Sequence, residues 1–404
     1  MFRFLCTAFC LVAVSFAIAQ QSTQLPDNFH YTKLKNGLEV LVIEDNAVPL
    51  ATIEIVVKNG AYTEAPEYDG LSHLYEHMFF KANRDYPSQE EYMDRVNELG
   101  ISFNGTTSKE RVNYFITLSN SQLVEGLEFM NSAIRYPLFL EQEMKNENPV
   151  VDGEFQRNES NPMFFLRDEI SHRMWGSLYS RKNTIGDHDI IMTATPEKMR
   201  EIQKKYYYPN NSMLTIAGDV DHNVIFEQAQ KIFGDWEPCD FDPFEKWPIP
   251  EFRPLKGESR FVLENENARV PIFTFAYFGP DTRGDLEATY AADVFSFTLQ
   301  QKASKLQKEL VESGLALHVD IGYSTLKHTG EIYITLVPNP QSIKEAYEKL
   351  NEQVEQWDDP SYFTDEQMQT GKDMLAIQDA YGKEAPSEYI HTITYWWASA
   401  SLDY

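Results

Sequence analysis

Short runs of alternating hydrophobic and polar residues along the first half of the chain predict β-strands. Five segments carry this pattern: residues 31–44, 51–58, 101–104, 113–118 and 213–217. The first of them contains Asn36-Gly37, a dipeptide typical of tight hairpin turns. Segments with helical spacing separate the strands: residues 88–99, 121–135, from 140 onward, and 196–207. This order of elements predicts an α+β fold with an antiparallel-rich sheet.

Three short sequences of the first half recur in the second half, in the same order and at similar spacing. The pairs are Glu98-Leu99-Gly100-Ile101 with Glu312-Ser313-Gly314-Leu315, residues 114–118 with 332–336, and residues 139–144 with 363–368. We therefore expect two repeated half-domains, each an antiparallel-rich mixed sheet packed with helices on one side. An equal second copy would end at about residue 448, so the repeat also predicts that this chain is truncated after Tyr404.

Composition marks two further segments. Residues 1–19 contain Arg3, then an apolar run, then Ala17-Ile18-Ala19, which is the pattern of a secretory signal peptide cleaved near Ala19. The apolar run is short for a membrane span, and no later segment is long and apolar enough to form one. Residues 236–257 carry Pro248, Pro250 and Pro254 among acidic and aromatic residues, which predicts a linker. The two expected domains are then residues 20–235 and 258–404.

The most informative motif is His73-Leu74-Tyr75-Glu76-His77, with the order H-x-x-E-H. On a helix, His73 and His77 lie one turn apart on one face, and two neutral imidazoles so arranged form half of a tetrahedral zinc site. Glu76 lies beside them, where it can take a proton from water. Two histidines four residues apart also occur by chance on exposed helices. The apolar residues directly after the motif favour a buried helix, whose polar groups need partners.

A catalytic zinc site usually has a third protein ligand and keeps one position for water. Residues 147–154 offer three carboxylates: Glu147, Asp152 and Glu154. Glu147 and Glu154 are seven residues apart and share one face if the helix is continuous. An acidic, solvated helix face is the alternative interpretation. Pro149 can kink this helix and Gly153 loosens it, which weakens the prediction for Glu147.

Charge excludes some classes of partner. The chain has 62 acidic and 35 basic residues, a net charge of −27. Such an acidic protein is not expected to bind nucleic acid or an anionic membrane surface. The other histidines (His30, His172, His188, His222, His318, His328 and His391) lack the spacing of metal ligands, and we interpret them as surface or structural residues.

These motifs resemble the pitrilysin/insulinase family of inverted-zincin metallopeptidases, in its processing-peptidase-like small-subunit branch. Glu154 stands at that family's spacing from His77, and Asn104-Gly105-Thr106-Thr107-Ser108 resembles its substrate-binding edge strand, with Gly105 in the place of an Ala. The resemblance implies one zinc ion per chain, bound by His73, His77 and Glu154. It implies Glu76 as general base, Glu147 as support for the site, and Asn104 on the strand that binds the substrate backbone. The catalytic zinc domain is then residues 20–235.

The second half lacks the motif and, by resemblance, is a non-catalytic repeat. Leu310 and Leu317 occupy the places of an Arg and a Tyr that hold substrate carbonyls in the family. We therefore expect a heterodimer with a family member that carries the Arg and the Tyr. The leading hypothesis is a secreted or periplasmic zinc endopeptidase that hydrolyses unfolded oligopeptides. The alternatives are a non-catalytic structural subunit and a peptide-binding module that uses the open sheet edge without hydrolysis.

Overall fold

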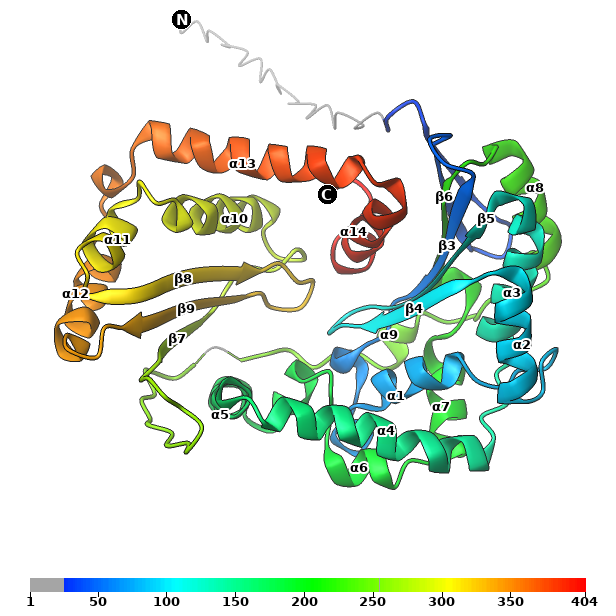
Figure 1. Cartoon of the computed structure of the whole chain (residues 1–404), viewed down its shortest axis with the longest axis horizontal. Helices are drawn as coiled ribbons and strands as arrows, with labels where there is room; N and C mark the ends of the chain where they lie inside the picture. Colours follow the sequence, from blue (N-terminus) through cyan, green and yellow to red (C-terminus); the bar gives the residue numbers. More distant parts are fainter. Residues whose placement is uncertain (1–24, 254) are drawn as a thin grey trace, which may run out of the picture.

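The computed structural model describes residues 25–253 and 255–404, so the predicted signal peptide at residues 1–19 lies outside the described residues. The first half is built on a six-stranded sheet in the order β1-β2-β6-β3-β5-β4 (Figure 1). Its strands are β1 (Phe29–Lys33), β2 (Glu39–Glu44), β3 (Leu50–Val57), β4 (Ser102–Thr107), β5 (Val112–Ser119) and β6 (Ser212–Gly218). Only the β2–β6 pair is parallel among these neighbours, so the sheet is mixed and antiparallel-rich, as predicted.

The predicted hairpin at Asn36-Gly37 is confirmed. Gly37 has φ 90°, which favours glycine, and β1 pairs antiparallel with β2 across the turn. The side chain of Asn36 donates to the carbonyls of Phe233 and Trp236, at 2.8 and 3.0 Å. The turn is therefore attached to the end of the first half.

Helices cover one face of this sheet and enclose the main hydrophobic core, which includes Val40, Ile53, Leu74, Met130 and Phe233. The helices up to the end of the first half are α1 (Leu71–Phe79), α2 (Gln89–Leu99), α3 (Leu123–Arg135), α4 (Glu141–Glu159), α5 (Pro162–Trp175), α6 (His188–Met192), α7 (Pro196–Tyr206) and α8 (His222–Phe233). Helix α2 begins as predicted, because Ser88 accepts the amide of Glu91, and ends at Gly100 in the left-handed conformation.

The second half repeats this plan on a smaller sheet. Strands β7 (Phe273–Phe278), β9 (Glu331–Pro338) and β8 (Ala316–Ser324) form an antiparallel sheet in that order. The helices are α10 (Leu286–Gln300), α11 (Lys305–Gln307), α12 (Ile343–Glu355), α13 (Asp365–Lys383) and α14 (Pro386–Ser399). The recurring sequences occupy matching positions: Gly100 and Gly314 both have positive φ before a strand, and α4 and α13 both span 19 residues. The predicted fold class of two repeated α+β halves is confirmed.

Each half also lends a helix to the other half, which the sequence did not predict. Helix α14 lies against the open face of the first sheet, where Trp397 and Ala398 pack on Leu41, Val56 and Met213 (Figure 1). Helix α5 does the reverse. Its residues Met174 and Trp175 pack on Ala276, Phe278 and Tyr333 of the second sheet. Both sheets are therefore covered on a second face by a helix from elsewhere in the chain.

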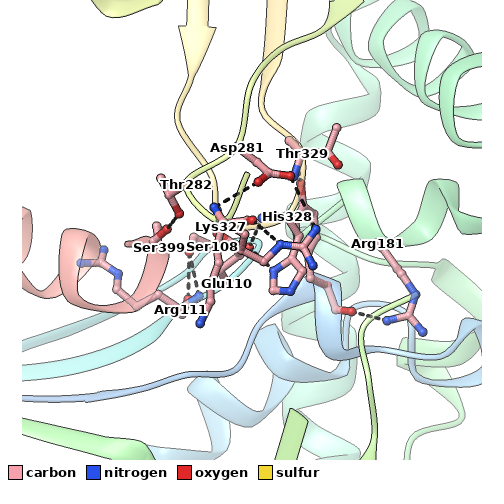
Figure 2. Close-up of polar contacts among 12 residues, drawn as sticks. Ser108, Glu110, Arg111, Arg181, Asp281, Thr282, Lys327, His328, Thr329 and Ser399 are labelled. Carbon is pink, nitrogen blue, oxygen red and sulfur yellow. Dashed lines mark hydrogen bonds and ion pairs between the residues drawn. The ribbon is translucent and has the colours of Figure 1, made fainter. Parts of the chain in front are cut away.

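Two hairpin turns meet where the halves join (Figure 2). The carboxylate of Glu110, after β4, accepts the backbone amides of Lys327 and His328 at 2.7 and 2.9 Å and lies 2.7 Å from His328 Nδ1. Beside it, Lys109 Nζ contacts Glu331 Oε2 at 2.7 Å. The turn of the first half is thus held to the turn of the second half by charge-assisted hydrogen bonds.

The described residues of the predicted linker, 236–253 and 255–257, contain the short helix α9 (Pro243–Lys246) and otherwise irregular backbone. No helix in the described part of the chain combines the length and the apolar composition that a membrane span requires.

Candidate metal and catalytic site

The site is built on α1, and the start of this helix is unusually constrained. Gly70 precedes the helix with φ 84°, and a Cβ on Gly70 would lie 2.6 Å from Gly186 Cα. The buried carboxylate of Glu64 accepts the backbone amides of Gly70 and Ser72, at 2.9 and 2.6 Å. These contacts satisfy amides that a helix start leaves free and fix the direction of α1.

Helix α1 brings His73 and His77 to the same point of α4. Their Nε2 atoms lie 3.6 and 3.8 Å from one oxygen of Glu154. The two imidazole rings are perpendicular, with centroids 4.8 Å apart. One ligand atom from each of the three side chains lies within 4.8 Å of the other two. The structure therefore brings together the three residues that the sequence singled out as metal ligands.

This donor set fits zinc. With bonds of about 2.1 Å, two ligand atoms of a tetrahedral zinc lie about 3.4 Å apart, close to the separations found here. Two imidazoles and one carboxylate are the donors of many catalytic zinc sites, which leave a fourth position open. Burial and the neighbouring His77 lower the pKa of His73 to about 4, so its imidazole is neutral near pH 7, the form that binds a metal.

Glu147 lies behind His77 in the arrangement of an orienting carboxylate. Its Oε1 is 2.8 Å from Nδ1 of His77, and its Oε2 is 2.7 Å from Nζ of Lys81. Burial opposes ionisation of Glu147, but the hydrogen bonds from His77 and Lys81 outweigh it and lower the pKa of Glu147. An Nδ1–H that donates to this carboxylate leaves the Nε2 lone pair of His77 directed to Glu154.

The expectation that Pro149 would weaken the place of Glu147 is corrected by the structure. Helix α4 continues through Pro149 from Glu141 to Glu159. Pro149 removes one backbone hydrogen bond, while tertiary contacts hold the helix on both sides of it. Asn148 donates to the carbonyl of Ala194 at 3.3 Å, and Val151 is fully buried. Glu147 and Glu154 consequently share one face of a continuous helix.

Glu76 projects from α1 toward β4. Its Oε2 accepts a hydrogen bond of 2.6 Å from Thr107 Oγ1. A Cβ on Gly105 would lie 2.8 Å from Glu76 Cγ, so the glycine at this position gives Glu76 room against the strand. Burial raises the pKa of Glu76, although the Thr107 hydrogen bond acts in the opposite direction. A buried carboxylate with a raised pKa is suited to accept and release a proton.

Asn104 lies on β4, the last strand in the order of the first sheet. Side chains alternate along a strand, so Asn104 faces away from the side on which Gly105 and Thr107 contact Glu76. Its Oδ1 accepts the amide of Gly105 at 2.9 Å. Asn104 is thus next to Gly105, which contacts Glu76, but the Asn104 side chain does not join the metal cluster.

The two leucines predicted to replace a carbonyl clamp have different surroundings. Leu310 lies in a π-helical turn, Lys308–Glu312, and is fully buried in the second core. Leu317, near the start of β8, is 57% exposed. Neither side chain can donate a hydrogen bond to a peptide.

Sequence reasoning missed two groupings of histidines. His188, interpreted as a surface or structural residue, pairs with Asp152 on α4, two residues before Glu154. His30 and His222 meet at Glu44, at a distance from the H-x-x-E-H motif. A strand and a helix almost 200 residues apart create the second grouping, so no local spacing could have indicated it.

Comparison with known proteins agrees with this architecture. A family model described as Insulinase (Peptidase family M16) matches residues 39–187, and one described as Peptidase M16 inactive domain matches residues 193–375. An uncharacterized zinc protease of Rickettsia felis is 29% identical over 213 residues, which are 52% of this chain and 50% of that protein. The probable zinc protease PqqL of Haemophilus influenzae is 26% identical over 74% of this chain and 33% of its own length. The matches therefore span half or less of these two relatives.

Solved structures show the same fold. A protease from Helicobacter pylori aligns over 92% of this chain and 89% of its own, with a TM-score of 0.76 at 22% identity. Pitrilysin aligns over 83% of this chain and 37% of its own, with a TM-score of 0.67 at 17% identity. The two family models together account for both halves of the molecule, and the named relatives include zinc proteases. The chain belongs to the M16 family of peptidases, the insulinase and pitrilysin family.

Proposed function

We propose that this chain is a zinc-dependent endopeptidase that hydrolyses peptide bonds in unfolded oligopeptides. The observation that carries the proposal is the convergence of His73 and His77 on one oxygen of Glu154. Glu76 lies directly before His77 on the same helix. We assign His73, His77 and Glu154 as the ligands of one zinc ion. We assign Glu147 as the residue that orients His77, through the 2.8 Å contact described above.

When bound, zinc would polarise the scissile carbonyl and make the attacking water more acidic. Glu76 accepts the proton of that water and then passes it to the amine of the departing peptide. Its burial and its hydrogen bond from Thr107 hold the carboxylate in one orientation.

The substrate class follows from β4. Its outer edge is unpaired in the part of the sheet that the structure describes, so an extended peptide can add to it as a further strand. Backbone hydrogen bonds to an edge do not depend on side chains, and an unfolded segment can offer its backbone along its whole length. Asn104 on this strand is our candidate for contact with the substrate.

The proposal extends to a partner and a location. Leu310 and Leu317 cannot orient a substrate carbonyl, so we propose that a second family member with an Arg and a Tyr in these places completes the site. We propose export to the periplasm or the medium, because residues 1–19 have the pattern of a signal peptide and a solved relative is named a periplasmic protease, PqqL from Escherichia coli. Membership of the small-subunit branch is part of this proposal.

One experiment tests the function against the alternatives of a structural or peptide-binding subunit. The zinc content and the cleavage of a quenched peptide library are measured for the wild type, Glu76→Gln and the control Glu141→Gln, an exposed carboxylate on α4. We expect Glu76→Gln to keep zinc and to lose about 10²–10⁴-fold in kcat/KM, since its amide cannot accept a proton. Undiminished activity in Glu76→Gln refutes the base assignment.

Adding a co-purified family member tests the partner. A rise in kcat/KM on addition is expected. Full activity of the lone subunit, unchanged by the partner, contradicts the heterodimer.

A further inference from the structure

A second group of histidine and carboxylate side chains lies on the first sheet, away from α1. His30 comes from β1, Glu44 from the end of β2, and His222 from the first turn of α8. One ligand atom from each lies within 4.8 Å of the other two. In the described residues only this group and the one on α1 meet that criterion, and both contain two imidazoles and one carboxylate.

Glu44 is fixed in the centre of this group. Its Oε1 accepts the backbone amide of His222 and contacts His222 Nδ1, both at 2.8 Å. Its other oxygen, Oε2, lies 3.6 Å from Nε2 of His30. The hydrogen bonds from the backbone and side chain of His222 lower the pKa of Glu44, so this carboxylate is charged near neutral pH.

The two imidazoles stack on each other, with centroids 3.6 Å apart and planes 8° from parallel. A metal lies near the plane of each imidazole that binds it, so one ring must turn before both can share an ion. His30 can turn without breaking a short contact to Glu44, because its nearest distance of 3.6 Å exceeds a hydrogen bond. His222 is held by Glu44 on one side and by Phe226, whose ring is 5.8 Å away, on another.

Solvent reaches the group. The side chains of His30, Glu44 and His222 are 24%, 30% and 28% exposed. A metal there could therefore complete its coordination with water. The spacing of about 3.4 Å between ligands of a tetrahedral zinc is close to the 3.6 Å that separates His30 from Glu44.

We propose that His30, Glu44 and His222 form a second binding site for zinc or a similar divalent transition-metal ion. The ion would join the edge strand β1 to the end of β2 and the start of α8. It lies outside the proposed catalytic group, so its role is to bind metal and tie these elements together and not to act on a peptide.

The test counts zinc in the intact chain at a buffered, micromolar free zinc concentration. We expect two equivalents in the wild type. His222→Ala and His30→Gln should each bind one and keep full peptide hydrolysis, because α1 and α4 are untouched. Glu154→Gln should also bind one but lose hydrolysis, and His222→Ala combined with Glu154→Gln should bind none. Two separate variants are used so that misfolding of one, seen by circular dichroism, does not decide the result.

His172→Ala is the matched control. His172 Nδ1 lies 3.5 Å from Asp168 on an exposed helix face, and in the described structure no third ligand joins that pair. This variant should keep both equivalents. A wild type that binds one equivalent, or folded His30 and His222 variants that bind as much zinc as the wild type, would overturn the proposal. Loss of one equivalent in these variants but not in Glu154→Gln supports the second site and contradicts the catalytic ligand assignment, so the two proposals fail separately.

Discussion

Asp152 and Glu154 are two residues apart on α4, yet their carboxylates have different partners. Glu154 points to the two imidazoles of α1. Asp152 is engaged by His188 and accepts a hydrogen bond of 2.7 Å from Gln156. A carboxylate that already has two partners has less capacity to bind a metal. The contacts of these two side chains therefore favour Glu154 over Asp152 as the metal ligand.

We predict that His73→Ala, His77→Ala and Glu154→Ala each lose one equivalent of zinc, whereas Asp152→Asn retains it. Each alanine removes one of three protein ligands, while Asn keeps the shape of Asp152 and a hydrogen bond to Gln156. The measurement is zinc per chain after dialysis against a weak chelator. An empty site in Asp152→Asn together with a full site in Glu154→Ala would move the ligand by two positions.

At the scale of single residues, the sequence predicts placement where local geometry determines it. The H-x-x-E-H order places two imidazoles on one face because helical geometry does so in any protein. The partner of that face required the family resemblance, since the spacing places both Glu147 and Glu154 on one helix face and does not distinguish between them. The pairs His188–Asp152 and His222–Glu44 could not be predicted, because tertiary packing alone brings their residues together.

Two buried carboxylic acids, Glu64 and Asp69, lie just before α1, and their protonation makes the stability of this region depend on pH. Burial and then Glu64 raise the pKa of Asp69 from 3.8 to about 8, and burial raises the pKa of Glu64 to about 7. The folded state therefore binds more protons than the unfolded state between these values. Their contribution to the free energy of unfolding is complete below pH 3.8 and is lost as pH rises to about 8.

We predict that Asp69→Asn flattens this dependence and stabilises the metal-free protein at pH 8, because Asn has no proton to lose. The effect is on the order of a few kcal/mol at pH 8 and vanishes toward pH 4. Urea unfolding at several pH values, with chelator present, measures it. The control Asp94→Asn, on the exposed side of α2, should leave the slope unchanged; an equal slope in Asp69→Asn and wild type would contradict the argument.

The close contact between Gly70 and Gly186 at the start of α1 leads to a second prediction for this element. Gly186 has φ 91°, and a Cβ there would lie 2.3 Å from Gly70 Cα. The atoms that this Cβ would meet belong to the backbone of Asp69 and Gly70, so Gly186→Ala should lower the free energy of unfolding by more than about 2 kcal/mol. Gly153→Ala in α4, where nothing lies within 4 Å, should instead raise it by about 0.5–1 kcal/mol. Urea unfolding of both variants decides between them.

Elements with a clear hydrophobic period were predictable. Strands β3, β5 and β6 and helices α3 and α7 begin and end within two residues of the predicted segments. The period of 2 or 3.6 residues reports which side of an element is buried, and that determines its type. It does not report what buries it. The destinations of α5 and α14, each on the sheet of the other half, therefore could not be predicted.

At the scale of the molecule, Trp397 joins the halves. It is 4% exposed, packs on the first sheet, and donates from Nε1 to Glu39 Oε2 at 3.1 Å. We predict that Trp397→Ala lowers the free energy of unfolding by about 3–5 kcal/mol. Trp396→Ala is the control and should cost less than half as much, because the Trp396 ring is only half-buried and lies at a tilt against Tyr404. Urea unfolding measures both losses. Equal losses in the two variants would mean that the packing of Trp397 on the first sheet stabilises the protein no more than an ordinary half-buried contact.

The helix that α14 lends to the first sheet has a consequence for synthesis of the protein. Strands β2, β3 and β6 can pair as soon as residue 218 has left the ribosome, but the helix that covers their second face begins at Pro386. At ~5–20 residues per second, Leu41, Val56 and Met213 stay uncovered for roughly 10–30 s. During that time the nascent chain displays an apolar sheet surface to every protein around it. A chaperone that binds extended apolar surface would be the natural companion of this chain until α14 has been made.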